Sequence, residues 1–177
     1  MNDGARVYDE RNVGVMRVGP ECAAEALSIL REAAAWASAR GIEVWNDTEL
    51  REQDFLDGAR LNQLAMGFAG GHAAAAMLLH TSDPVYWPEV VPGSSLYLHK
   101  IAVRRAYAGK DWLRRLIEFA ALDAQARGIA WLRLDTIHGS PLRGLYERHG
   151  FAVVDEPALN VRGRLMIRME RALCRST

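Results

Sequence analysis

The sequence is poor in cysteine, with only Cys22 and Cys174 among 177 residues. The two lie far apart, and neither has a cysteine or histidine nearby at metal-ligand spacing, so neither a disulfide framework nor a zinc site is indicated. Net charge is also absent, because 22 basic residues balance 22 acidic ones. Without an overall field to attract a polyanion, we expect no nucleic-acid or membrane partner.

Long apolar runs are missing as well. The N-terminus has no apolar core of the signal-peptide type, and charges interrupt the longest alanine-rich run. We therefore expect a cytoplasmic protein with free thiols. No repeat, low-complexity tract or linker appears, and half of the residues are hydrophobic, so we expect one domain over residues 1–177.

The densest basic segment, residues 162–175, holds five arginines and alternates as a strand does. We interpret it as the solvated face of a terminal strand. A local patch that binds a polyanion is the alternative.

Hydrophobic periodicity predicts the order of the secondary structure elements. Apolar residues at every third or fourth position indicate helices, and apolar runs between turn residues indicate strands. The predicted strands cover residues 13–18, 62–69, 72–79, 95–103, 131–135, 151–155 and 164–171. The predicted helices cover residues 20–40, 48–56, 111–128 and a short segment that Ser140-Pro141 opens and Gly150 closes.

The turns between these elements suggest a topology. Gly70-Gly71 readily supplies the positive φ of a tight hairpin turn, so residues 62–79 are predicted to form an antiparallel hairpin. The strand-helix-strand unit in the second half predicts local parallel pairing. We therefore expect a mixed α/β fold, with a central, mostly antiparallel sheet, one parallel β-α-β unit and flanking helices.

The connection from the strand at 95–103 to the helix at 111–128 is a candidate anion site. Such a loop presents unpaired backbone N–H groups and the positive end of a helix dipole, as a pyrophosphate requires. Basic side chains nearby add positive charge: Arg104, Arg105, Lys110, Arg114 and Arg115. Many strand-to-helix turns look alike, so a simple solvated loop is the alternative.

The segment Leu145-Tyr146-Glu147-Arg148-His149-Gly150-Phe151 is the most distinctive in the sequence. It follows the apolar strand ending in Ile101-Ala102-Val103, the loop, the amphipathic helix and the strand at 131–135. Together these features resemble the core of the GNAT N-acetyltransferase superfamily, whose hallmark is a Leu-Tyr-Glu-x-x-Gly-Phe segment after the phosphate loop. The Tyr86-Trp87-Pro88 loop and the element order extend the resemblance to most of the chain.

The resemblance implies an enzyme that transfers an acetyl group from acetyl-CoA directly to a primary amine, without a metal. Tyr146 would protonate the leaving thiolate. Backbone groups of the strand would hold the pantetheine arm, and loop amides the pyrophosphate. The implied cofactor-binding residues are Ile101, Ala102, Val103, Ala108, Gly109, Lys110, Asp111, Trp112, Leu113 and Ser140, which stands near the place of a family asparagine.

The phosphate loop departs from the family pattern Arg/Gln-x-x-Gly-x-Gly/Ala. Ala108, Asp111 and Leu113 occupy its three defining positions, and Gly109 remains. We expect Asp111 to cap the helix, where its carboxylate would compete with phosphate for backbone N–H groups. A second hypothesis is therefore a catalytically inactive GNAT-fold binding protein that has lost CoA.

Acetyl transfer also needs a proton acceptor, because an alkylamine with a pKa of about 10.4 is mostly protonated at neutral pH. The candidates are His99, His138, Glu43 and a water chain. His99 lies two residues before Ile101 and is expected on the same face of the strand.

Aromatic residues in two predicted loops are candidates for the acceptor site, since their rings stack on cationic amines. They are Trp45, Tyr86 and Trp87; simple packing is the alternative. Neutral overall charge and aromatic loops favour a small-molecule amine as the substrate over a protein. Whether the chain forms a homodimer is left open.

Overall fold

A computed structural model describes residues 14–42, 44–154, 159–161 and 163–174. Its strands are β1 (Gly14–Arg17), β2 (Leu64–Ala69), β3 (His72–His80), β4 (Ser95–Val103), β5 (Trp131–Ile137), β6 (Ala152–Val153), β7 (Leu159–Val161) and β8 (Arg164–Ala172). Its α-helices are α1 (Ala23–Ser38), α2 (Glu52–Arg60), α3 (Trp112–Ala126) and α4 (Leu142–Glu147). Single 3-10 turns form at Pro20–Cys22, Asp47–Glu49 and Arg105–Tyr107.

The strands form one mixed sheet in the order β1-β2-β3-β4-β5-β8-β6, and β7 also pairs with β8. β4 and β5 run parallel, whereas every other recorded pair is antiparallel. The predicted fold class is therefore confirmed. The hairpin is confirmed too, because Ala69 pairs with His72 around Gly70 and Gly71, whose φ angles are 55° and 78°.

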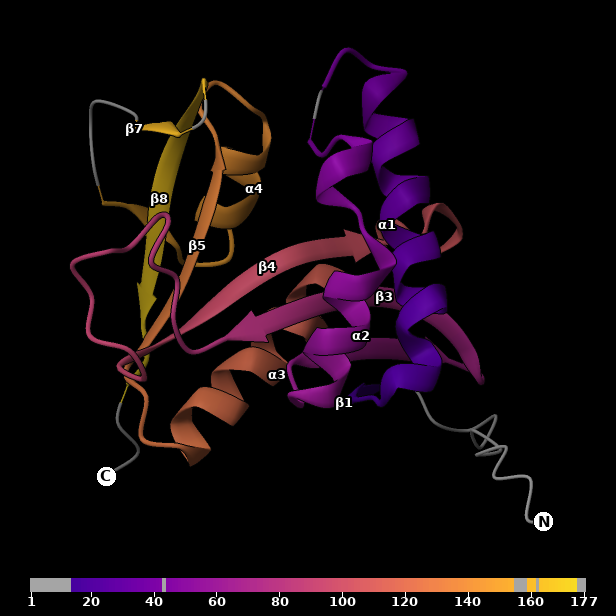
Figure 1. Ribbon diagram of the computed structural model, residues 1–177, viewed down its shortest axis with the longest axis horizontal. Helices are drawn as coiled ribbons and strands as arrows, with labels where there is room; N and C mark the ends of the chain where they lie inside the picture. The colour runs from indigo at the N-terminus through magenta and orange to yellow at the C-terminus, as the bar shows by residue number, and fades with distance from the viewer. Residues whose placement is uncertain (1–13, 43, 155–158, 162, 175–177) are drawn as a thin grey trace.

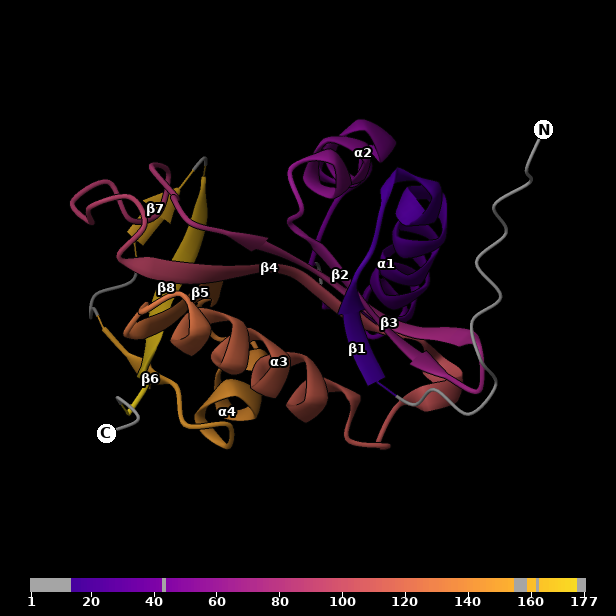
Figure 2. The same cartoon turned by 90° about the horizontal axis from the view of Figure 1, so that it is seen from below.

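Helices cover both faces of the sheet. Seen from below, α1 and α2 lie on one face of the first four strands, and α3 and α4 lie on the other (Figure 2). Each face buries a separate apolar cluster, one under α3 and one under α1 and α2. No helix among the described residues is long and apolar enough to cross a membrane.

The second helix differs from its prediction of residues 48–56. Asn46 Oδ1 accepts hydrogen bonds from the backbone N–H groups of Thr48 and Glu49 and holds a separate 3-10 turn there. Arg51 is extended, with a ψ of 135°, and α2 begins only at Glu52. A side-chain hydrogen bond thus competes with the helix, as short polar residues often do.

The basic terminal strand is not simply a solvated face, and this part of the interpretation was wrong. Arg168 in β8 is only 9% exposed. Its guanidinium bonds the Tyr86 carbonyl oxygen at 2.9 Å, pairs with Glu89 and lies 4.6 Å from the centre of the Trp87 ring. The loop before β4 covers this arginine. The alternation of residues in the strand cannot predict a contact with a loop so distant in the sequence.

Candidate active site

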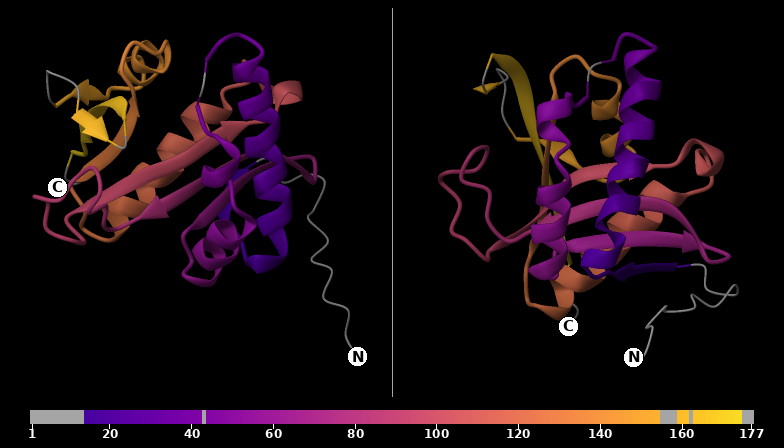
Figure 3. Two further views of the ribbon diagram at one scale, coloured as in Figure 1. Left: turned by 45° about the horizontal axis from the view of Figure 1, so that its top comes forward. Right: turned by 45° about the vertical axis from the view of Figure 1, so that its right-hand side comes forward.

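β4 and β5 separate along the sheet and leave a notch between its two halves. They pair only over residues 95–97 and 131–133, and then diverge (Figure 1). Figure 3 shows the same separation from two further sides. Beyond Tyr97 no strand lies along this edge of β4 in the described part of the chain. An extended ligand can therefore bond to the exposed backbone groups.

A bulge in β4 lies beside the notch. Lys100 has a φ of 51°, which is uncommon for a residue other than glycine. The register with β3 shifts here, so that Lys100 and Ile101 together lie opposite Met77. A bulge of this kind bends a strand and changes the direction of its side chains.

The bulge also reverses the alternation of side chains along β4. Leu98 and Ile101 both pack against the cluster under α3, whereas Ala102 packs under α1. His99 instead contacts Tyr97 and His80 on the opposite face. The expectation that His99 and Ile101 share a face was therefore wrong, because the strand contains one extra residue between them.

Two cavities meet in the notch. The polar cavity, of about 230 Å³, is lined by charged and aromatic residues from both halves of the sheet. The loop cavity, of about 410 Å³, lies between the end of β4, the loop that follows it and the start of α3. The residues that line both are Val44, Trp45, Ile101, Leu142 and Tyr146. Molecules bound in the two cavities can therefore meet at this shared wall.

Tyr146 lies on α4 in the shared wall and is only 8% exposed. Burial raises the pKa of its phenol, and the nearby charge of Asp135 raises it further. The hydroxyl is therefore protonated at neutral pH and can act as a proton donor. Its ring packs edge-to-face on Phe151 at 6.0 Å.

Local capping fixes α4 and hence Tyr146. Ser140 Oγ accepts a hydrogen bond from the Leu142 N–H at 3.2 Å, as an N-terminal cap does. At the other end, Gly150 takes a φ of 84° and lets the Phe151 N–H reach the Tyr146 carbonyl oxygen. The segment from Leu145 to Phe151 thus fixes the position of Tyr146, because the helix that carries it ends in a tight turn.

Three polar side chains form a chain that leads into the polar cavity. His99 Nε2 lies 3.4 Å from Asp83 Oδ2, and His99 Nδ1 lies 3.8 Å from Asp135 Oδ1. Burial raises the pKa of Asp135 to about 6, and the Asp83 charge adds to this rise while His99 opposes it. Asp135 is therefore a base with a pKa near neutrality, as proton transfer requires.

Asp83 lies behind His99 and anchors it. Asp83 Oδ1 accepts hydrogen bonds from the N–H groups of Val85 and Tyr86. Burial raises the pKa of Asp83, but His99 and these N–H groups outweigh burial and lower it overall. Asp83 is thus ionised, and its charge can orient the imidazole. His80 also contacts His99, and burial lowers the pKa of His80 to about 4, so His80 is neutral.

The same three residues are the ones that could hold a metal ion. Asp83, His99 and Asp135 each offer one ligand atom within 4.8 Å of the others, a cluster that the sequence did not predict. However, the two carboxylates face different nitrogens of one imidazole, and a single ion binds through one nitrogen of a given ring. The arrangement also suits a polar relay through the imidazole, with one carboxylate near each ring nitrogen.

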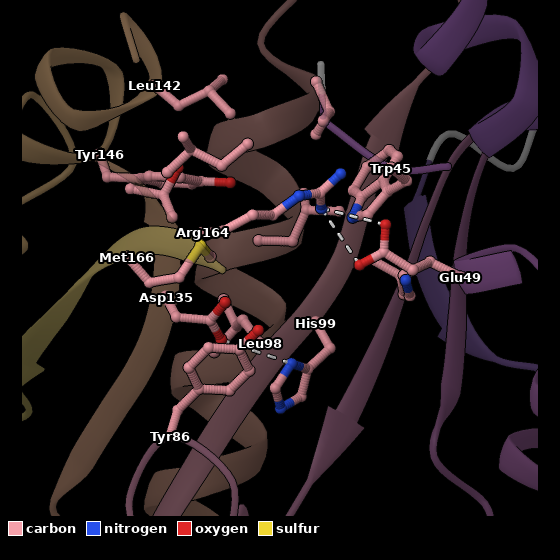
Figure 4. A pocket seen from close by; sticks show the side chains of 15 residues that line it. Trp45, Glu49, Tyr86, Leu98, His99, Asp135, Leu142, Tyr146, Arg164 and Met166 are labelled. Carbon is pink, nitrogen blue, oxygen red and sulfur yellow. Dashed lines mark hydrogen bonds and ion pairs between the residues drawn. The ribbon is translucent and has the colours of Figure 1, made fainter. Parts of the chain in front are cut away.

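An ion pair joins the two halves of the molecule at the polar cavity. Arg164 at the start of β8 reaches across to Glu49 in the 3-10 turn before α2, at 3.0 and 3.2 Å (Figure 4). Trp45 lies beside this pair, and Lys100 Nζ lies 5.6 Å from the centre of the Trp45 ring. None of these three charged residues was predicted, since their segments lie far apart in the sequence.

The loop cavity collects most of the predicted cofactor-binding residues. Those that line it are Ile101, Ala102, Val103, Ala108, Gly109, Asp111, Trp112 and Leu113. Lys110 and Ser140 are not among its lining residues; Lys110 Nζ lies 5.4 Å from the ring of Tyr107. The Trp112 side chain is buried against the core.

Asp111 does not cap α3 through its side chain, and that expectation was wrong. The residue is left-handed, with a φ of 59°, and its carboxylate makes no capping hydrogen bond. The side chain is 68% exposed and lies 3.4 Å from Arg114. Its backbone conformation directs the carboxylate away from the N–H groups, so Asp111 does not occupy the donors that a phosphate would use.

The other predicted residues divide between the cavities and the surface. Tyr86 and His99 line the polar cavity, and Trp45 lines both cavities. His138 is exposed and lines neither. Trp87 is 2% exposed and stacks between Arg133 and Arg168, outside the lining of both cavities. Glu43 lies outside the described residues.

Similar proteins agree with this architecture. The family model described as the acetyltransferase (GNAT) family matches residues 28–151. A GNAT-family acetyltransferase structure from Listeria monocytogenes is 22% identical, with a TM-score of 0.75, and the match covers 91% of this chain and 95% of that one. The PaiA N-acetyltransferase of Thermoplasma acidophilum, solved in complex with coenzyme A, is 15% identical, with a TM-score of 0.71 over 91% and 99% of the two chains.

N-acetylglutamate synthase from Neisseria gonorrhoeae, complexed with coenzyme A and N-acetylglutamate, is also similar. It is 15% identical with a TM-score of 0.67, and the match covers 93% of this chain but only 36% of that one. No curated protein matches the sequence. The solved structures share the fold, and the family model covers well over half of the chain. The chain therefore belongs to the acetyltransferase (GNAT) family and is an acyl-CoA-dependent N-acyltransferase.

Proposed function

We propose that the chain transfers an acetyl group from acetyl-CoA directly to the primary amine of a small molecule. One observation carries the proposal: Tyr146, a protonated phenol, and Asp135, a carboxyl with a pKa of about 6, line the same cavity. An acid and a base with such different affinities for protons suit opposite steps of acyl transfer.

In this proposal the donor occupies the loop cavity. Its pantetheine arm lies along the exposed edge of β4 beside Ile101 and Val103, and its diphosphate meets the loop at residues 108–113. The pKa of His149, which lines this cavity, is lowered by burial and by Arg148, Arg171 and Arg114. These arginines favour a diphosphate, although Asp111 opposes them and the three defining positions of the family's loop are changed.

The acceptor occupies the polar cavity, where Asp135 takes a proton from its ammonium group. His99 relays that proton, and Asp83 holds the imidazole in position. The free amine then attacks the thioester carbon. A C–N bond forms, the C–S bond breaks, and the leaving thiolate takes a proton from Tyr146. The attacking nitrogen then gives up its second proton, which restores the Tyr146 phenol. Overall, one proton leaves for each amide and CoA thiol formed.

A small acceptor is favoured by the dimensions of the site. The polar cavity of about 230 Å³ is smaller than the roughly 300–1,000 Å³ typical of pockets for drug-sized ligands. The Glu49–Arg164 pair also crosses from one half of the molecule to the other there (Figure 4). We expect this pair to hinder the entry of a peptide chain.

The Tyr146→Phe variant tests the mechanism. It should keep acetyl-CoA affinity within a few-fold, measured by calorimetry, because the hydroxyl acts on the leaving group and not on the bound donor. Turnover, followed by release of the CoA thiol, should fall by about 100- to 10,000-fold, the usual contribution of a positioned general acid. An unchanged turnover would remove Tyr146 from the mechanism.

A further inference from the structure

The polar cavity carries opposite charges at its two ends. Asp135 lies at one end together with His99, and Figure 4 shows these two side chains close to each other. Arg164 crosses to Glu49 beside Trp45 at the other end (Figure 4). The Asp135 carboxylate and the Arg164–Glu49 ion pair thus lie at different ends of the cavity.

Lys100 supplies a cation without a counter-ion at the Trp45 end. Its side chain lines the polar cavity and is half-buried, and its ammonium lies near the Trp45 ring. No carboxylate of the described residues forms an ion pair with it within 4.0 Å. Burial lowers the pKa of Lys100 although Glu49, Asp54 and Asp135 oppose this. The ammonium is therefore partly desolvated without a carboxylate partner among the described residues, a state that an anion would relieve.

The charges at the two ends differ in sign. Glu49 neutralises Arg164, so Lys100 leaves an excess positive charge at the Trp45 end. At the other end Asp135 carries a negative charge above its pKa of about 6. A molecule with an ammonium group and an anionic group matches both ends, whereas a diamine would place a second cation near Lys100.

Building on the proposed function, we propose that the acceptor is a small zwitterion of the amino-acid class, with its ammonium group at Asp135 and its carboxylate held by Lys100. The strained backbone of Lys100 supports this role. A non-glycine residue in the left-handed region costs free energy, and such residues cluster where a side chain must point into a site. Here the left-handed residue of the bulge is one that lines the cavity.

Matched acceptor pairs test the proposal with the unaltered protein. Each of the common L-amino acids is compared with the amine formed by removing its carboxylate, and release of the CoA thiol from acetyl-CoA is measured. At least one amino acid should be acetylated with a kcat/KM about 10-fold or more above that of its paired amine, because loss of a desolvated charge contact weakens binding by this much.

Variants then assign the effect to Lys100. Lys100→Met should lower kcat/KM for the preferred amino acid about 10-fold or more, mainly through KM, and should change the paired amine by less than about 3-fold. Lys100→Arg should restore much of the difference. Arg60→Met is the control, since this exposed arginine on α2 pairs with Asp57 at the surface, away from the lining of both cavities. Thermal unfolding and acetyl-CoA binding report whether each variant is folded.

The outcomes separate this proposal from the proposed function. If the amines without carboxylate are acetylated as well as or better than the amino acids, the zwitterion proposal is overturned and the acetyltransferase function stands. An equal effect of Lys100→Met on both members of a pair would also overturn it. If neither the amino acids nor the paired amines release CoA, the zwitterion proposal is overturned, and the proposed function is then tested with other small primary amines.

Discussion

Replacing Asp135 by asparagine should make the protein more stable at neutral pH and much less active. The Asp135 side chain is only 13% exposed, and burial raises its pKa from 3.8 to about 6. Between these two values the folded protein binds a proton that the unfolded chain has lost. The free energy of unfolding therefore falls as the pH rises through this window, by about 3 kcal/mol for a shift of this size.

Asparagine cannot ionise, so the variant should not show this fall. Urea unfolding at about pH 4 and about pH 7.5 measures the difference. Near pH 4 the two proteins should have similar stability, and near pH 7.5 the variant should be more stable by about 3 kcal/mol. Asp57→Asn is the control, because the Asp57 side chain is 55% exposed. A variant that is no more stable than the parent near pH 7.5 would refute the raised pKa.

The same substitution should remove the proton acceptor. Turnover should fall by about 100- to 10,000-fold, the usual contribution of a positioned base. In the unaltered protein, kcat/KM should rise with pH through about 6 as the carboxyl ionises, and the variant should lose this rise. Parent-like turnover in the variant would assign the base to another group, such as a water chain.

Two further substitutions test the loop and the core. Asp111→Gly should tighten CoA binding several-fold at low salt and less at high salt, because it removes an exposed carboxylate near the expected diphosphate; weaker binding in calorimetry would contradict that placement. Gly67→Ala should lower the free energy of unfolding by about 1–3 kcal/mol, since its Cβ would lie 2.6 Å from Trp112 Cζ3. Chemical denaturation against Gly14→Ala, which meets nothing within 4 Å, is the comparison, and equal stability would refute the clash.

The sequence by itself determined the elements whose signals are local. Gly70-Gly71 needs only its own positive φ angles to form the hairpin, and Ser140 and Gly150 cap α4 through neighbouring backbone groups. The parallel pairing of β4 and β5 followed from the strand-helix-strand order, because such crossovers have few alternatives. The segment from Leu145 to Phe151 identified Tyr146, because all of these residues lie in the short helix α4 or in the turn that ends it.

Tertiary structure alone decided the charged part of the site. His99 was a candidate from the sequence, but Asp83 lies in a loop and Asp135 in another strand, and only the tertiary fold brings the three together. Of the three, His99 and Asp135 line the polar cavity. The bulge at Lys100 shows the same limit, because an extra residue in a strand reverses every later side chain and leaves no local signal in an apolar run. Burial, which raises the pKa of Asp135, depends on chain segments distant in the sequence, so no pattern around residue 135 could reveal its protonation.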